Sequence, residues 1–387
     1  MKNLKQGIYN PERASNEMHR IDSKYASLYE KEHYFNSIEI DSIDEFDKWI
    51  EMCSLCHTNA YRGVNEAQYR IQTSGQIAYE NECRNTLQCQ TQDGYHKFMN
   101  SILSRVKQSS KIREILTQHN LPINDFLYFA LLQHYGYPSP LCDFSYDIKA
   151  ALFFMLDQLK MSNDCAKKIE NYCALYIINY EDPEFGSIQE VNRIGAEYAD
   201  NLVQDAKMKG YNIIGLSSQA ENDFKYLPYE SYKDIYYFGV HGSALGSTNV
   251  KIPSLGFTAK YEISNPRISA QSGMFIYIGD AFKSLERSTF EQSQRKHITV
   301  LNVNKNIVED IRKKYIPILK KTDIYPNDDV SLQIIDALKE VEGLYPMDYY
   351  KRKICWARSF CQKIKCGFKS IFYKMYNEIS GIFVGKK

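Results

Sequence analysis

Hydrophobic residues recur at helical spacing through most of the first half of this chain. A Ser42 to Glu45 capping signal precedes the first such segment. Residues 1–31 and 72–93 lack a clear apolar period, and we expect an irregular entry and a surface excursion there. The spacing therefore predicts three helices, within residues 33–55, 95–117 and 123–133.

Strand-type patterns are concentrated later in the chain. Short runs rich in β-branched and aromatic residues predict strands. These runs cover residues 61–68, 172–180, 250–261, 273–279 and 298–303. Helical spacing returns within residues 188–209, 307–315 and 331–340. Helices that come first and strands that come mostly later predict an α+β fold, with a mixed or antiparallel sheet as its core and helices largely N-terminal to it.

The stretch 132–155 joins two apolar segments through a turn rich in glycine and proline. Gly136 is a good helix terminator, and the prolines that follow it cannot continue a helix. Ser145 is the expected N-cap of a second helix, which is apolar on most faces and should be buried. This rigid element also contains His134 and Asp143, which are costly to bury without partners. We therefore expect these two side chains to serve a site.

The same stretch resembles the central signature of the FRG domain family. Gln133-His134-Tyr135-Gly136 matches the family motif fully, and residues 139–145 keep the leucine, the aspartate and two small hydroxyl residues of the next motif. Pro140 and Phe144 stand where the family has arginine and tryptophan. Three further motifs are similar to the family's and follow its order: Tyr61-Arg62-Gly63, the run from Arg267 to Phe275, and Tyr325-Pro326-Asn327-Asp328.

The resemblance divides the chain into three parts. Residues 1–58 are a helical or irregular lead-in, residues 59–342 an FRG-type domain, and residues 343–387 a basic helical tail. Charged residues make up 25% and hydrophobic residues 44% of the chain, which is typical of a soluble protein. The sequence shows no long uncharged apolar run and no apolar N-terminal segment. We therefore expect a cytoplasmic protein, with peripheral membrane contact as an alternative that the tail allows.

Positive charge is concentrated in the tail. Residues 351–387 hold ten Lys or Arg and one acidic residue, a net of +9, and because the whole chain carries +1, residues 1–350 carry −8. An acidic body argues against tracking of a nucleic-acid backbone. The tail's apolar residues fall on one helical stripe from Cys361 to Ile382. We expect this amphipathic helix to dock on its own body or on a second copy, with an anionic membrane or a partner protein as alternatives.

Seven residues form the candidate site. We expect Arg62, Gly63, Arg267 and Ser272 to bind a nucleotide, with the arginines on its phosphates. Catalytic roles are assigned to His134, Asp143 and Gln271, which would orient a ribose or a base. The alternative is structural: the arginines would pair with buried carboxylates such as Asp143, and His134 would be a core histidine with satisfied hydrogen bonds.

A second resemblance indicates a reaction. Tyr61-Arg62-Gly63 at a strand end is similar to the first motif of arginine-type ADP-ribosyltransferases, whose arginine anchors NAD, and Ser272 is similar to their serine-rich motif. This resemblance implies a nucleotide-using effector enzyme that transfers ADP-ribose or cleaves NAD, and the FRG resemblance implies a place in bacterial phage defence. The catalytic glutamate of that family has no clear counterpart, and the candidates are Glu262, Glu286 and Glu291.

A function of another class stays open. The domain would then be a non-catalytic module that binds a nucleotide or nucleic acid and signals through its basic tail. The two functions differ in one requirement, because an enzyme needs a carboxylate opposite Arg62 and a binding module does not.

The cysteines indicate no metal centre. Cys53-Ser54-Leu55-Cys56-His57 has the spacing of a haem-attachment motif. Zinc binding by Cys53 and Cys56, together with His57 or with the Cys83 and Cys89 pair, is a further alternative. Because Cys53 and Cys56 lie on adjacent turns of a predicted helix, we favour small apolar residues at a partly buried surface.

Overall fold

The computed structural model describes most of the chain between Ser23 and Tyr350. The described residues are 23–86, 90–119, 121, 123, 125–159, 167–179, 182, 208, 237–240, 248–252, 257–261, 266–326 and 328–350. Four expectations fall wholly or mostly outside them: the irregular entry as far as residue 22, the helix over 188–209 apart from Met208, the role of Glu262, and the basic tail beyond Tyr350.

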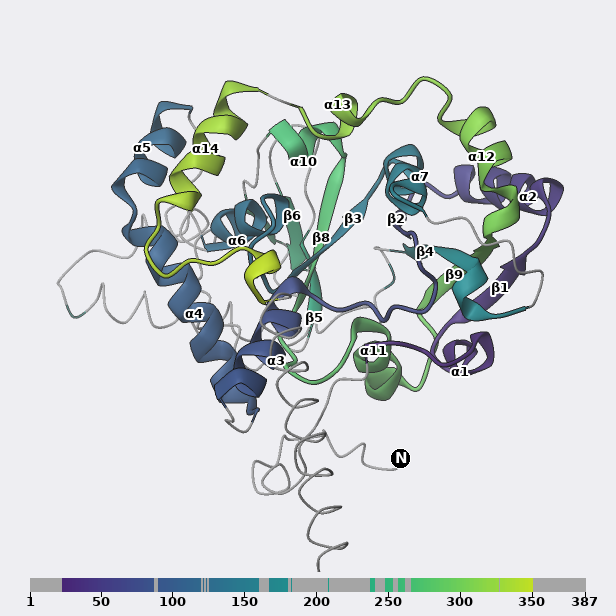
Figure 1. Cartoon of the computed structure of the whole chain (residues 1–387), viewed down its shortest axis with the longest axis horizontal. Helices are drawn as coiled ribbons and strands as arrows, with labels where there is room; N and C mark the ends of the chain where they lie inside the picture. Colours follow the sequence, from purple (N-terminus) through teal and green to yellow (C-terminus); the bar gives the residue numbers. More distant parts are fainter. Residues whose placement is uncertain are drawn as a thin grey trace, which may run out of the picture.

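A seven-stranded mixed sheet forms the core of the α+β fold (Figure 1). The strand order is β1-β9-β4-β2-β3-β8-β5, in which β1 and β9 are parallel and all other neighbours are antiparallel. The strands are β1 (Asn36–Ile40), β2 (Asn59–Val64), β3 (Leu141–Ser145), β4 (Tyr172–Asn179), β5 (Tyr237–Val240), β8 (Gly273–Ile278) and β9 (Ile298–Asn304). β6 (Thr248–Ile252) and β7 (Phe257–Tyr261) pair separately with each other.

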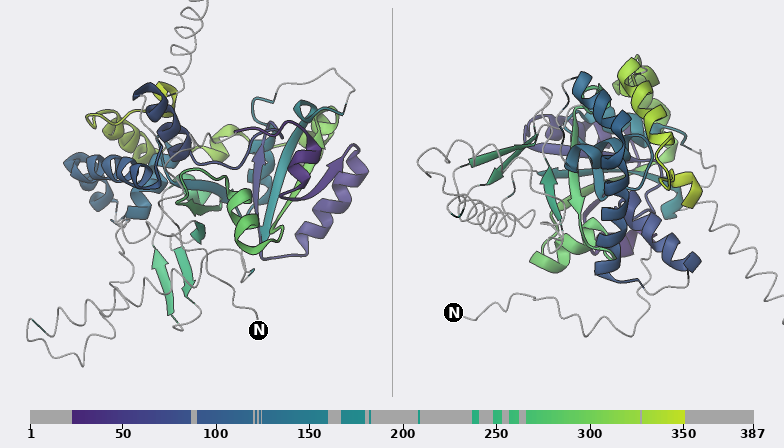
Figure 2. Two further views of the ribbon diagram at one scale, coloured as in Figure 1. Left: turned by 90° about the horizontal axis from the view of Figure 1, so that it is seen from below. Right: turned by 90° about the vertical axis from the view of Figure 1, so that its left-hand side faces the viewer.

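Helices gather at two ends of the sheet (Figures 1 and 2). One group covers the β3 and β8 half: α3 (Ser74–Thr86), α4 (Gln92–Gln108), α5 (Ser110–Gln118), α6 (Asp125–His134) and α14 (Asp329–Lys339). The other group covers β1, β9, β4 and β2: α2 (Ile43–Ser54), α7 (Ile148–Leu156) and α12 (Val308–Tyr315). Shorter helices complete the fold: α1 (Leu28–Glu32), α10 (Pro266–Ala270), α11 (Leu285–Ser293) and α13 (Lys321–Ile324).

Successive side chains along a strand alternate between the two faces of the sheet, which explains why the sheet has a separate apolar cluster on each face. In β4, Cys173, Leu175 and Ile177 face the α2–α7–α12 layer, whereas Tyr172, Ala174 and Tyr176 face the opposite cluster. Successive side chains of a strand point to opposite faces, so a strand that is apolar throughout is buried on both sides. This opposite cluster includes Tyr25 and Leu285, from the N-terminal segment and from α11.

Several local predictions are confirmed. Ser42 and Glu45 form a capping box at the start of α2. Gly136 follows α6 with φ +80°, a left-handed conformation that stops a helix at little cost for glycine. The strands β4, β8 and β9 lie where β-type runs predict them, and α12 and α14 lie where helical spacing returns.

Other local predictions are wrong. The segment over 72–93 is mainly a helix, α3, and not a surface excursion, because its polar residues Thr73, Gln76 and Asn81 are buried. Residues 141–145 form strand β3, so Ser145 is not a helix N-cap. Asp147 caps α7 by accepting a hydrogen bond from the backbone of Lys149. No pattern in the sequence predicted β1, a strand within the N-terminal lead-in that pairs with β9 at the edge of the same sheet.

Candidate functional site

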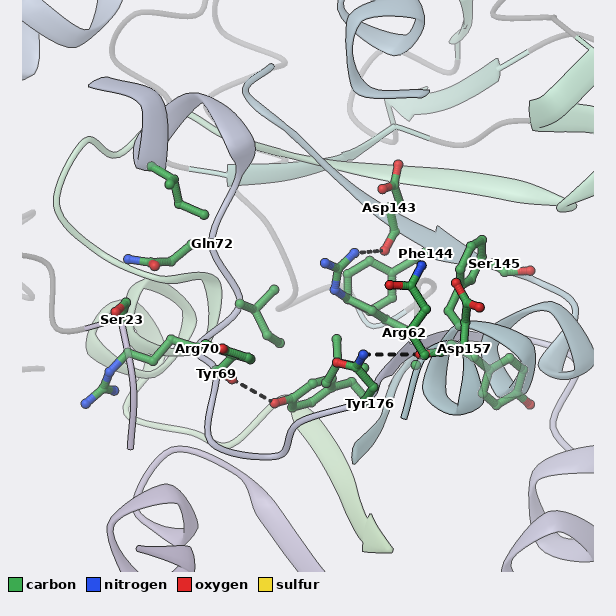
Figure 3. A pocket seen from close by; sticks show the side chains of 18 of the residues that line it. Ser23, Arg62, Tyr69, Arg70, Gln72, Asp143, Phe144, Ser145, Asp157 and Tyr176 are labelled. Carbon is green, nitrogen blue, oxygen red and sulfur yellow. Dashed lines mark hydrogen bonds between the residues drawn. The ribbon is translucent and has the colours of Figure 1, made fainter. Parts of the chain in front are cut away.

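A cavity of about 850 Å³ opens beside the centre of the sheet (Figure 3). Its walls come from β2, from β3, from the segment between β2 and α3, from α3 itself and from the end of α7. The polar and charged residues of its lining include Arg62, Arg70, Gln72, Glu80, Asn81, Asp143, Asp157 and Gln271. Residues from these separate segments meet because β2 lies next to both β3 and β4 in the sheet.

Arg62 lies in the middle of this cavity. Its Nη1 donates to the backbone carbonyl of Asp143 at 2.7 Å, and its Nε is buried with no hydrogen-bond partner among the described residues. No ion pair of Arg62 occurs within the described parts of the chain. Burial alone would lower the pKa of Arg62, but Cys142, Asp143 and Tyr176 raise it above its usual value. The cavity therefore contains a positive charge that Asp143 stabilises at a distance and that no carboxylate of the described residues pairs with directly.

Gly63 lines the cavity and also lies against α7. A Cβ atom at this position would come within 1.8 Å of the Ala151 carbonyl oxygen and 2.7 Å of the Met155 nitrogen. No side chain fits at such distances, so glycine allows α7 to approach β2 closely. The structure thus gives Gly63 a packing role that is independent of any ligand.

Arg70 is a second cavity arginine, which sequence reasoning missed. Its Nη2 bonds Glu30 at 2.7 Å, its Nη1 lies 4.0 Å from the buried Glu286, and its guanidinium lies 4.0 Å from the ring centre of Tyr25. The charge of Arg70 is therefore compensated by two carboxylates, unlike that of Arg62. No sequence motif marks Arg70, because its partners come from α1 and α11.

His134 and Arg267 contact each other but do not line the cavity. Arg267 Nη1 donates to the His134 carbonyl at 2.8 Å. The guanidinium of Arg267 also lies between two rings, 4.5 Å from the centre of Tyr135 and 5.5 Å from that of Tyr325. Because Tyr325 does line the cavity, this pair lies one residue layer behind its wall.

Asp143 and Gln271 lie at the cavity, and Ser272 is not among its lining residues. Gln133 Nε2 donates to Asp143 Oδ2 at 2.7 Å, which leaves Oδ1 buried without a hydrogen-bond partner among the described residues. Gln271 Nε2 donates to the Ile324 carbonyl at 3.1 Å. Ser272 has φ +46° at the turn before β8, and its carbonyl accepts from the Tyr146 backbone. The structure thus brings together four of the seven candidates: Arg62, Gly63, Asp143 and Gln271.

The carboxylates of the cavity differ from those expected by elimination. Glu286 is fully buried and accepts hydrogen bonds from Tyr25, Ser284 and the Ile71 backbone. Glu291 pairs with Lys283 and Arg287. Neither residue lines the cavity, whereas Glu80, Asp143 and Asp157 do. Asp157 directly follows α7, and its position at the cavity depends on the contact of α7 with β2.

The stability of the protein should depend on pH through His134. Burial is the main cause that lowers the pKa of His134 to about 4. The charge of Asp143 acts to raise this pKa, and the charge of Arg267 lowers it further. The unfolded chain, with a histidine pKa of about 6.5, binds the proton more readily, so unfolding becomes easier as the pH falls from about 6.5 to 4. In denaturant titrations at pH 7 and pH 5, His134→Gln should lose less stability on acidification than wild type. His119→Gln, at an exposed position, should lose as much stability between pH 7 and pH 5 as wild type.

The described residues contain neither a cluster that could hold a metal ion nor a helix that could span a membrane. No group of three or more His, Cys, Asp or Glu is placed to hold a metal ion, and Cys53 is buried whereas Cys56 is exposed. No described helix is long and apolar enough to span a membrane.

Comparisons with known proteins indicate a family for the central part of the chain. Neither the curated proteins nor the solved structures gave a significant match. The family model described as FRG domain matches residues 57–164. This range contains Tyr61-Arg62-Gly63, Gln133-His134-Tyr135-Gly136 and Asp143, which carry the resemblance in the sequence. The chain is therefore similar to the FRG domain over residues 57–164, the part that supplies β2, β3 and most of the cavity wall.

Proposed function

We propose that the cavity binds a nucleotide and that the protein is a nucleotide-using effector enzyme. The most concrete substrate is NAD, which the protein would cleave or use to transfer ADP-ribose. The observation that carries this proposal is Arg62, a buried positive charge without an ion pair among the described residues, in a cavity large enough for a dinucleotide. A phosphate is the nucleotide group that such a guanidinium binds best.

The order of charges along the cavity supports the same substrate (Figure 3). Arg70 and Gln72 lie on one side, Asp157 lies on the opposite side, and Arg62 lies between them. NAD has a comparable order, with a neutral adenine, an anionic diphosphate and a cationic nicotinamide. We place the diphosphate at Arg62 and the nicotinamide ribose toward Asp157.

The reaction needs one bond to break at that end. The bond between ribose C1′ and the nicotinamide nitrogen breaks with its electron pair going to the ring, so nicotinamide leaves neutral and positive charge develops on the ribose. A carboxylate close to that charge lowers the barrier, and Asp157 is our candidate. Oδ1 of Asp143 is available to accept a hydrogen bond from a ribose hydroxyl. Water or an acceptor nucleophile then bonds to C1′, with loss of its proton.

Asp157→Asn tests the catalytic part of this proposal. The change keeps the size of the side chain and removes its charge, so NAD turnover should fall about 100-fold while NAD affinity changes little. Nicotinamide release by purified protein is the measurement, with Asp310→Asn on the exposed face of α12 as the matched control. Unchanged turnover in Asp157→Asn would reject this carboxylate. Tight NAD binding by wild type without any turnover would instead support the non-catalytic binding module.

The biological setting rests on resemblance. The FRG family implies bacterial phage defence, and consumption of NAD or modification of a target suits such an effector. Growth of bacteria that express wild type or Arg62→Ala, with and without phage challenge, is the direct test.

A further inference from the structure

In the described part of the chain, hydrogen-bond donors without a partner occur in three residues of the cavity lining, Arg70, Gln72 and Asn81. Asn81 Nδ2, Gln72 Nε2 and the Nε and Nη1 atoms of Arg70 are buried, and none has a hydrogen-bond partner among the described residues. All three residues line the cavity, and Asn81 is only 2% exposed. Buried polar groups are nearly always hydrogen-bonded in folded proteins, so these donors indicate a ligand that offers acceptors.

The charge balance on this side argues for a neutral ligand group. Glu30 and Glu286 compensate Arg70, and Glu80 is a further carboxylate in the cavity lining. A phosphate here would meet the carboxylates that already pair with Arg70, whereas Arg62 has no ion pair among the described residues. Acceptors without formal charge, such as the ring nitrogens and carbonyl oxygens of a nucleobase, suit this set of donors.

The segment that holds Arg70 and Gln72 is anchored by contacts with the N-terminal segment and with α11. Glu286 accepts a hydrogen bond from the Ile71 backbone at 3.2 Å, between Arg70 and Gln72 in sequence. Lys24 forms an isolated antiparallel bridge with Tyr69, and the Tyr25 nitrogen donates to the Gln68 carbonyl at 2.8 Å. Fixed donors bind a ligand without the entropy loss of ordering a loop. The partly exposed Tyr69, at 43%, adds an aromatic residue to the same wall.

We infer that Gln72 and Asn81 form a nucleobase subsite of the cavity, in which their side-chain amides donate hydrogen bonds to acceptor atoms of the base. The inference rests on the proposed binding of a nucleotide, and it names the end of the ligand that this side recognises. The base lies on the Arg70 side, and the phosphate extends toward Arg62.

Two substitutions and two ligands test the subsite. AMP contains a base and ribose 5-phosphate lacks one, so their affinities separate base contacts from phosphate contacts. Asn81→Leu and Gln72→Met, which remove the donors at similar volume, should each weaken AMP binding roughly 10-fold and leave ribose 5-phosphate binding unchanged. Calorimetric titration of the full chain measures both. Because neither amide donor has a hydrogen-bond partner among the described residues, neither change should lower the melting temperature.

The controls keep this test distinct from that of the enzyme. Gln118→Met, on the exposed surface of α5, should leave both ligands unaffected. AMP binding that is absent in wild type, unchanged in both variants, or weakened together with ribose 5-phosphate overturns the subsite. If AMP binding depends on Asn81 but NAD is never consumed, the subsite stands and the enzyme proposal fails. If NAD is consumed with the same KM in wild type and Asn81→Leu, the enzyme stands and the subsite is rejected.

Discussion

Arg62→Ala is expected to reduce NAD turnover at least about 1,000-fold while the melting temperature falls by only a few degrees. The guanidinium is placed to bind the diphosphate, and loss of a charged contact in a buried site has effects of this size. Its hydrogen bond to the Asp143 carbonyl at 2.7 Å is its structural contribution. An unpaired carbonyl costs about 1–3 kcal/mol, and each kcal/mol lowers the melting temperature by about 1–2 °C in a chain of this size.

Nicotinamide release and thermal denaturation of the same samples separate the two roles of Arg62. Arg62→Lys should retain part of the activity, because it keeps the charge but loses the forked geometry. Arg287→Ala, at a half-exposed arginine of α11 outside the cavity, is the matched control. A fall of melting temperature as large as that of a core truncation would show that Arg62 holds β2 to β3 and would favour the structural alternative.

Gly63→Ala is expected to destabilise the protein by about 3 kcal/mol or more, with or without ligand. The added methyl group would lie 1.8 Å from the Ala151 carbonyl oxygen, which belongs to the backbone of α7. A helix backbone cannot move aside as a flexible side chain does, so α7 would have to shift away from β2 and lose part of its apolar contact. Urea titration of the apo protein measures the loss.

Gly136→Ala provides the comparison for this change. Gly136 has φ +80° and no atom within 4 Å of an added Cβ, so only backbone strain is introduced, at a cost of about 1–2 kcal/mol. A much larger effect at Gly63 would identify the helix contact as its main requirement. If Gly63→Ala costs no more than Gly136→Ala, the close approach of α7 to β2 is not as tight as the structure describes.

The sequence by itself determined features that depend on neighbouring residues. The Ser42 and Glu45 capping box, the stop at Gly136 and the apolar run of β8 all act within a few residues, so their patterns predict the structure directly. The order of helices and strands was enough for the α+β class. The FRG motifs also led to Arg62 and Asp143, which lie at the cavity because β2 and β3 are adjacent strands.

Only the tertiary structure decided features that depend on distant contacts. α3 is a helix despite its polar sequence, because Gln76 bonds the Asp280 and Lys283 carbonyls more than 200 residues away. The roles of Glu286 and Asp157 differ for the same reason. Glu286 is enclosed by Tyr25 and the Ile71 backbone, whereas Asp157 is carried to the cavity by the contact of α7 with β2. Local sequence gives no information on which chain segment will cover a side chain, because burial and charge compensation are set by residues far along the chain.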